Sequence, residues 1–158
     1  AITLKEMELL SRTKIFASTY SELVTKNIKE GKVDPKKMEM NEANYQRFQG
    51  KTIFGNYFKP AADGSLLFKT ELIRDVVFVR QNANFDSSVP GCNLILFRNQ
   101  LIYMNISQEE KVISNLRDNL NTGGFLAIGI KENLEHLGCG CSFINLNSSE
   151  KVYKKKNG

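Results

Sequence analysis

Apolar residues recur with helical spacing in four segments of the chain. They predict amphipathic helices over residues 4–10, 21–31, 41–48 and 108–120. The last helix is the best defined, because Val112, Ile113 and Leu116 fall on one face, and Ser107 is a suitable capping residue at its start. Asn41 is expected to cap the third helix, and Gly31 is expected to end the second.

Short apolar runs between these helices predict strands. They cover residues 15–17, 66–69, 76–79, 94–97 and 125–130, followed by a hairpin of 143–146 with 151–155. Strands that alternate with helices and end in a hairpin predict an α/β fold, with a mostly parallel sheet and an antiparallel end. The run 125–130 is continuous and is expected to be buried on both faces. Several glycines and Pro60 predict a loop-rich excursion over residues 51–65.

Composition narrows the class of protein. A chain of 158 residues with 41% hydrophobic and 25% charged residues suits one globular domain. No apolar run approaches the roughly 20 residues that span a bilayer, and no secretory signal is visible, so no membrane insertion is expected. Three cysteines, an odd number, favour a reducing compartment and a cytoplasmic location over a disulfide framework.

Neither the charged residues nor the cysteines and the histidine indicate a particular ligand. The net charge is +5, and four lysines lie near the end of the chain, at positions 151, 154, 155 and 156. They could protect a solvated edge strand from aggregation, or attract an acidic partner. Nucleic acid is not expected, because basic and aromatic residues do not interleave. Cys139 and Cys141 lack a zinc-site spacing, so no metal is expected, and the lone His136 is assigned no role.

Polar residues follow the strand 94–97 directly. Arg98 and Asn99 come at its carboxyl end, and Tyr103 follows shortly after. Open α/β sheets bind their ligands at the carboxyl ends of strands, which makes these residues candidates for a site. Alternatively, Arg98 pairs with a surface carboxylate, and Tyr103 packs its ring in the core with a solvated hydroxyl.

The same stretch resembles the chemotaxis receptor methyltransferases of the CheR family, whose pattern here is Asp-Leu-Ile-x-Cys-Arg-Asn-x-x-Ile-Tyr-Phe. The matching residues are Leu94, Ile95, Arg98, Asn99, Ile102 and Tyr103. The resemblance continues in order through residues 107–120, 123–129, 131–133 and 151–155, and upstream at 14–19. Residues 131–133 resemble a Ser-Glu-Asn loop of the family. The order and spacing of these motifs make the resemblance specific over nearly the whole chain.

The resemblance implies a Rossmann-like methyltransferase sheet that uses S-adenosylmethionine. Residues 1–158 would form a partial methyltransferase domain, incomplete at the N-terminus, because the family's first strand and its small-residue cofactor turn find no counterpart. These elements could be removed, disordered or carried by another chain, or the chain could be a natural half-domain. The implied activity is methylation of glutamate side chains on chemotaxis receptors.

The resemblance also assigns roles to individual residues. Arg98 would clamp the incoming carboxylate and Tyr103 would orient it, as the catalytic pair. Thr19, Asn82, Ala83 and Asn99 would contact the cofactor. Asn82 and Ala83 would contact the adenine, and Asn99 would lie near the methionyl part or hold the turn. Asn82 could equally belong only to a turn, which its residue type favours.

Three departures from the family pattern lie around the cofactor. Thr19 replaces an acidic residue that accepts the ribose hydroxyls, Asn93 replaces an aspartate, and Phe97 replaces a cysteine. A neutral hydrogen bond contributes about 1 kcal/mol, against about 1.5–3 kcal/mol for a charge-assisted one, so weaker cofactor binding is expected. The alternative function is therefore a catalytically impaired homologue that acts as a receptor- or partner-binding module.

Residues 51–74 fall where some family members carry a small antiparallel β-subdomain that docks a receptor's C-terminal peptide. The expected partners are thus the cytoplasmic helices of a chemotaxis receptor or that peptide. Aromatic residues of the segment could line an exposed strand edge. They could also simply cover the chain's own sheet.

Overall fold

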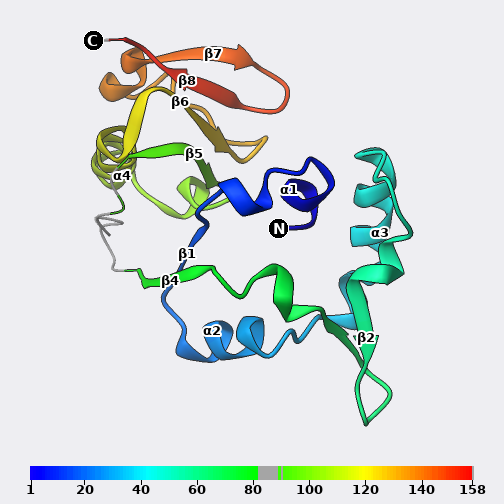
Figure 1. Cartoon of the computed structure of the whole chain (residues 1–158). Helices are drawn as coiled ribbons and strands as arrows, with labels where there is room; N and C mark the ends of the chain where they lie inside the picture. Colours follow the sequence, from blue (N-terminus) through cyan, green and yellow to red (C-terminus); the bar gives the residue numbers. More distant parts are fainter. Residues whose placement is uncertain (82–88, 90, 158) are drawn as a thin grey trace. The chain divides into compact units, whose positions relative to one another are not determined.

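The computed structural model describes residues 1–81, 89 and 91–157. These residues form two compact units, Ala1–Arg80 and Gln81–Gly158, which are considered separately (Figure 1). Both units combine helices with strands, and both contain parallel strand pairs. The expected α/β class and the antiparallel terminal hairpin are confirmed.

The first unit contains two small sheets. Strands β1 and β4 pair in parallel, with Phe16 opposite Val77, and β2 and β3 form an antiparallel hairpin, with Phe58 opposite Phe68. Three helices accompany them. The bounds are α1 Ile2–Glu6, β1 Phe16–Thr19, α2 Glu22–Lys29, α3 Met38–Arg47, β2 Phe58–Pro60, β3 Leu66–Phe68 and β4 Val77–Arg80.

Helix α2 begins and ends where its sequence predicts. The Ser21 side chain accepts a hydrogen bond from the Val24 N–H at 3.2 Å, which caps the first turn. Gly31 follows the helix with a φ of 73°, in the left-handed region that glycine adopts readily. Its carbonyl accepts from the Phe68 N–H at 2.7 Å, so the end of α2 is joined to β3.

Helices α1 and α3 differ from their predicted bounds. Helix α1 ends at Glu6, and a separate 3₁₀ turn covers Leu10–Arg12. Helix α3 begins at Met38 rather than at Asn41. The earlier start follows from a 3₁₀ turn at Pro35–Lys37, in which Asp34 accepts from the Lys36 N–H and Pro35 occupies the first position.

A buried aromatic cluster forms the core of the first unit. Tyr45, Phe54 and Tyr57 are each at most 9% exposed, and the Tyr45 ring lies 5.3 Å from Phe54 and 5.9 Å from Tyr57. The carboxylate of Glu6, itself only 6% exposed, lies within this cluster. It accepts hydrogen bonds from both tyrosine hydroxyls and, at 2.7 Å, from the Lys51 N–H. Phe54 and Tyr57 therefore belong to the core and do not line an exposed edge.

The second unit is a four-stranded sheet with one long helix. The strand order is β5-β6-β8-β7, in which β5 and β6 are parallel and the remaining pairs are antiparallel. The helix α4 covers one face, so that Val112, Ile113 and Leu116 pack with Leu126, Ile128 and Tyr153 (Figure 1). The bounds are β5 Cys92–Phe97, α4 Ile106–Asn119, β6 Leu120–Ile128, β7 Phe143–Asn147 and β8 Val152–Lys155.

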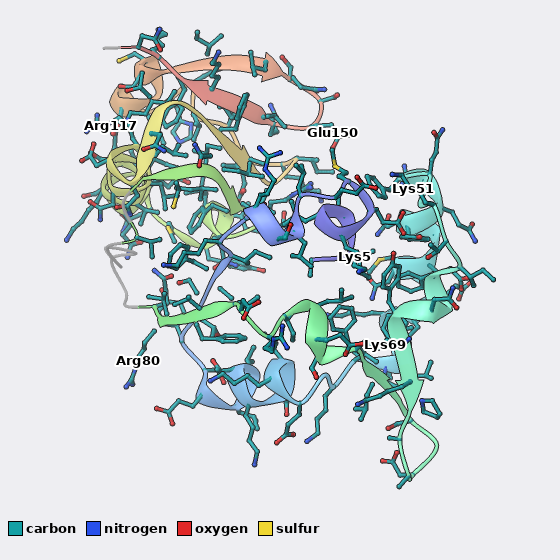
Figure 2. All side chains as sticks on the ribbon, viewed as in Figure 1. Lys5, Lys51, Lys69, Arg80, Arg117 and Glu150 are labelled. Atoms are coloured by element: carbon teal, nitrogen blue, oxygen red, sulfur yellow. The ribbon has the colours of Figure 1, made fainter. Side chains whose placement is uncertain are left out.

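Two expectations about these strands are wrong. Strand β6 alternates instead of being buried on both faces, because Leu126 and Ile128 are fully buried toward α4 while Phe125 is 39% exposed. Strand β8 is an inner strand and not an edge strand, because it lies between β6 and β7 in the sheet. The Lys155 ammonium donates to the carbonyls of Arg117 and Leu120 at 2.6 and 2.7 Å, where it stabilises the carboxyl end of α4. Arg117 is labelled at this end of the helix in Figure 2.

No helix among the described residues combines the length and the apolar character needed to cross a bilayer. The longest described helix, α4, has fourteen residues and carries charged side chains.

Candidate functional site

The predicted catalytic residues lie on one short loop between β5 and α4. Arg98 follows the end of β5 directly, and a 3₁₀ turn covers Leu101–Tyr103. Both Arg98 and Tyr103 are exposed, Tyr103 to 81%, while Leu101 between them is 2% exposed and anchors the loop in the core. The structure therefore places both side chains on the same loop, accessible to a ligand.

The alternative interpretation of these two residues finds no support among the described residues. Among residues 1–81 and 91–157, no carboxylate forms a salt bridge with Arg98. Tyr103 is far too exposed to be a core ring. An exposed arginine and tyrosine whose side chains pair with nothing in the described parts of the chain are available there to bind an anionic group.

A buried glutamate, Glu132, fixes this loop by accepting hydrogen bonds from its backbone. Glu132 lies in the turn after β6 and is 4% exposed. Its Oε2 accepts from the Asn99 N–H at 3.1 Å and from the Gly129 N–H, and its Oε1 accepts from the Leu101 N–H at 2.7 Å and the Ile102 N–H at 3.4 Å. Sequence reasoning assigned Glu132 no role, although it lies within the Ser-Glu-Asn-like motif that could have drawn attention to it.

The backbone around this glutamate is closely packed. Asn99 has a φ of 58°, in the left-handed region that asparagine tolerates better than most residues. A side chain at position 129 would meet the Asn99 Oδ1, the Glu132 Oε2 at 2.7 Å and the Asn99 backbone nitrogen at 2.9 Å, so it would force these neighbours to shift. The Asn99 N–H is already bonded to Glu132, which leaves the side-chain amide as its group for a ligand.

The predicted ribose-binding residue, Thr19, lies at the carboxyl end of β1 in the first unit. Its hydroxyl accepts from the Ser21 N–H at 3.2 Å and keeps its own proton to donate. Glu22, one turn further on, is 90% exposed at its side chain and lies 3.9 Å from Arg80. Such an exposed pair contributes little to stability.

Asn82 and Ala83, predicted to contact the adenine, lie outside the described residues. Their assignment stays a prediction. The described strand β4 ends just before them, at Arg80.

The two described residues that are expected to contact S-adenosylmethionine, Thr19 and Asn99, are neutral and belong to different units. The Thr19 hydroxyl can donate one hydrogen bond to a ribose oxygen, and the Asn99 amide can both donate and accept. No carboxylate stands at Thr19's place to accept both ribose hydroxyls. At Thr19, a neutral hydroxyl would make a weaker ribose contact than an acidic residue would provide.

Outside this loop, two glutamates of α4, Glu109 and Glu110, contact the segment that precedes β7. Glu110 accepts from the backbone N–H groups of Gly138 and Cys139, and His136 Nε2 lies 2.6 Å from Glu109 Oε2. Burial, together with the neighbouring Glu110, raises the pKa of Cys139 to about 12, so this thiol is a poor nucleophile. No three His, Cys, Asp or Glu side chains within the described parts of the chain are placed to hold a metal ion.

The first unit has a surface hollow of about 620 Å³ beside α2 and β4. Its lining mixes Glu71 with Lys29 and Arg74, so it does not favour one sign of charge. None of the predicted site residues lines it. The hollow is therefore not assigned to the candidate site.

Comparison with known proteins agrees with the motifs. The model of a family described as "CheR methyltransferase, SAM binding domain" matches residues 1–149. A "Putative methyltransferase Cher3" of Pseudomonas putida is 28% identical over 155 residues, which are 98% of this chain and 56% of that protein. The "Chemotaxis protein methyltransferase 1" of Vibrio cholerae is 35% identical and that of Vibrio anguillarum 34% identical, each over 82 residues, or 51% of this chain and 30% of theirs. The chain thus spans about half the length of the Pseudomonas relative, and its matched part about a third of the Vibrio ones.

Proposed function

Because the chain belongs to the CheR methyltransferase family, we propose that it methylates glutamate side chains of a chemotaxis receptor, with S-adenosylmethionine as methyl donor. One observation carries this proposal. Arg98 and Tyr103 are exposed together on the loop after β5, and no described carboxylate pairs with the arginine. The relatives are methyltransferases by name and lend no support to a non-catalytic binding module.

The proposed chemistry asks the protein for alignment rather than for a base. S-adenosylmethionine, when bound, supplies an electrophilic methyl group. The acceptor carboxylate is already ionised near neutral pH, because the pKa of glutamate is ordinarily about 4.3. Arg98 holds this carboxylate through charge-assisted hydrogen bonds, and the Tyr103 hydroxyl donates a further bond that orients it.

The proposed partner is the cytoplasmic part of the receptor, either its helices or its C-terminal peptide. The β2–β3 hairpin supports a peptide contact, because β2 has no strand partner besides β3 among the described residues and Leu66 is 45% exposed. An extended peptide can add to such an edge as a further strand. The net charge of +5 favours an acidic receptor segment.

Methyl transfer from labelled S-adenosylmethionine to a purified receptor fragment tests the proposal in the full-length protein. We expect Arg98→Ala to lower kcat/KM by about 10- to 100-fold, because a charge-assisted bond is worth about 1.5–3 kcal/mol. Calorimetry with S-adenosylhomocysteine should show an almost unchanged cofactor affinity.

Arg47→Ala is the matched control, since Arg47 is exposed on helix α3 of the first unit and lies outside residues 51–74. It should leave transfer unchanged. A loss of transfer by Arg98→Ala that came wholly from cofactor binding would contradict the role proposed for Arg98. Absence of transfer by the unmodified protein would contradict the function itself.

A further inference from the structure

We infer that Glu132 is a positioning residue for the transfer reaction, because its carboxylate fixes the loop that carries Arg98, Asn99 and Tyr103. This inference rests on the proposed function. Glu132 itself is 4% exposed, so it acts through the loop and not by touching the acceptor.

The contacts of Glu132 join two strand ends. One oxygen holds Asn99, which follows β5, together with Gly129, which follows β6. The other oxygen holds Leu101 and Ile102 in the 3₁₀ turn. Since β5 and β6 are parallel neighbours, a single side chain locks the loop to the sheet at the carboxyl ends of both strands.

A carboxylate suits this position better than any other side chain. A buried negative charge is costly unless it is compensated. No lysine, arginine or histidine of the described chain pairs with Glu132, so its compensation comes from four backbone N–H groups. Glutamine has the same shape, but only its oxygen accepts hydrogen bonds, and its NH₂ group would face two N–H donors.

The loop depends on this anchor for its shape. The left-handed Asn99 and the absence of a side chain at Gly129 bring the two backbones close around the carboxylate. Surface loops without such ties are mobile, and a displacement of about 1 Å can cost a reaction about 100-fold. The distance between the Arg98 and Tyr103 side chains is therefore set by a residue that lies about thirty positions away in sequence.

Amide NMR of the full chain tests the anchor independently of activity. In Glu132→Gln, the amide signals of Asn99, Leu101, Ile102 and Gly129 should shift and their hydrogens should exchange faster. The matched control is Glu135→Gln, the same change at an exposed position three residues on, which should leave these four amides unmoved. Unmoved amides in Glu132→Gln would overturn the inference.

A double-mutant cycle tests whether the anchor positions Arg98. Glu132→Gln should lower kcat/KM for methyl transfer by about tenfold in the unmodified protein but by less than about twofold in Arg98→Ala, because coupled residues are not additive. Equal losses in both backgrounds would show a merely structural role and overturn the inference.

A second variant, Glu132→Asp, keeps the charge on a shorter side chain. It should recover part of both the amide pattern and the rate, and it replaces Glu132→Gln in both tests if that variant does not fold. If Arg98→Ala leaves transfer intact, the proposed function of Arg98 fails, whereas the amide result still decides whether the anchor exists.

Discussion

Two buried glutamates show how this fold accommodates a carboxylate in its interior. Glu6 and Glu132 are both nearly fully buried, and each carboxylate is surrounded by donors, hydroxyls in one case and backbone N–H groups in the other. In the sequence, Glu6 lies among the polar residues of the predicted helix over residues 4–10, beside Lys5 and near Glu8. The tyrosines that satisfy it lie far away in the chain, so only the folded structure reveals its task.

The stability of the first unit should depend on pH through Glu6. Hydrogen bonds from Tyr45 and Tyr57 lower the pKa of Glu6 from its usual value of 4.5. A carboxyl with a lowered folded pKa stabilises the protein above the unfolded pKa, and this contribution is lost as pH falls through the folded value. We expect the free energy of unfolding to decrease on acidification below about pH 4.5, and to decrease less steeply in Glu6→Gln.

Chemical denaturation between pH 7 and pH 3 measures this slope. Glu8→Gln, at an exposed glutamate two residues on, is the control and should keep the slope of the unmodified protein. If the Glu6 and Glu8 variants lose the same slope, the hydrogen bonds of Glu6 are not its cause.

At the scale of elements, helices were more predictable than their ends. The apolar face of α4 identified the helix, but the expectation that Ser107 caps it is wrong, because Ser107 lies inside the helix. The structure selects Asn105, which accepts from the Gln108 N–H at 3.0 Å while the Gln108 side chain accepts from the Asn105 N–H. The reciprocal capping box decided between them, because it satisfies two donors at once.

Replacing Asn105 and Ser107 one at a time tests which of the two residues caps α4. Asn105→Ala should lower the free energy of unfolding by about 1 kcal/mol, the usual value of a lost N-cap. Ser107→Ala, at an exposed position inside the helix, should change it by less than about 0.5 kcal/mol. Urea denaturation of both variants checks this, and a larger loss in the Ser107 variant would refute the capping assignment.

Strand neighbours were harder to predict than strands. Both strands of the terminal hairpin were recognised from their apolar runs, but chain order does not say which of the two joins β6. In the structure β8 pairs with β6, so β8 lies between β6 and β7. From this inner strand, the Lys155 ammonium donates to the Arg117 carbonyl near the end of α4. Sequence patterns are local, whereas the pairing of β6 with β8 joins residues 25 to 29 positions apart.

For the molecule as a whole, the sequence motifs identified the family and the loop with Arg98 and Tyr103, but not what supports that loop. Spacing indicates which residues follow a strand, and this placed Arg98, Asn99 and Tyr103 together. The hydrogen bonds of Glu132 connect separate segments and have no periodic signal. Of the residues expected to contact the cofactor, Thr19 belongs to the first unit, and Asn82 and Ala83 lie outside the described part.

Cofactor affinity should respond to the charge at position 19. We expect Thr19→Asp to bind S-adenosylhomocysteine about tenfold more tightly, because a carboxylate accepts from both ribose hydroxyls with charge-assisted bonds. Isothermal calorimetry of the full-length protein measures the change. Thr13→Asp, which adds the same charge at an exposed position before β1, is the control and should bind like the unmodified protein. Equal affinities for the Thr19 variant and the control would remove Thr19 from the cofactor site.

The bonds of Glu6 also bear on how the first unit folds. They join α1 to residues 39, 45 and 51 positions further along the chain. A helix of five residues does not persist alone in water, and closing loops of this length costs entropy before any contact forms. We therefore expect the amino-terminal segment to join its unit late during refolding, only after Tyr45 and Tyr57 have come together, and to be the first part to detach when the unit begins to open.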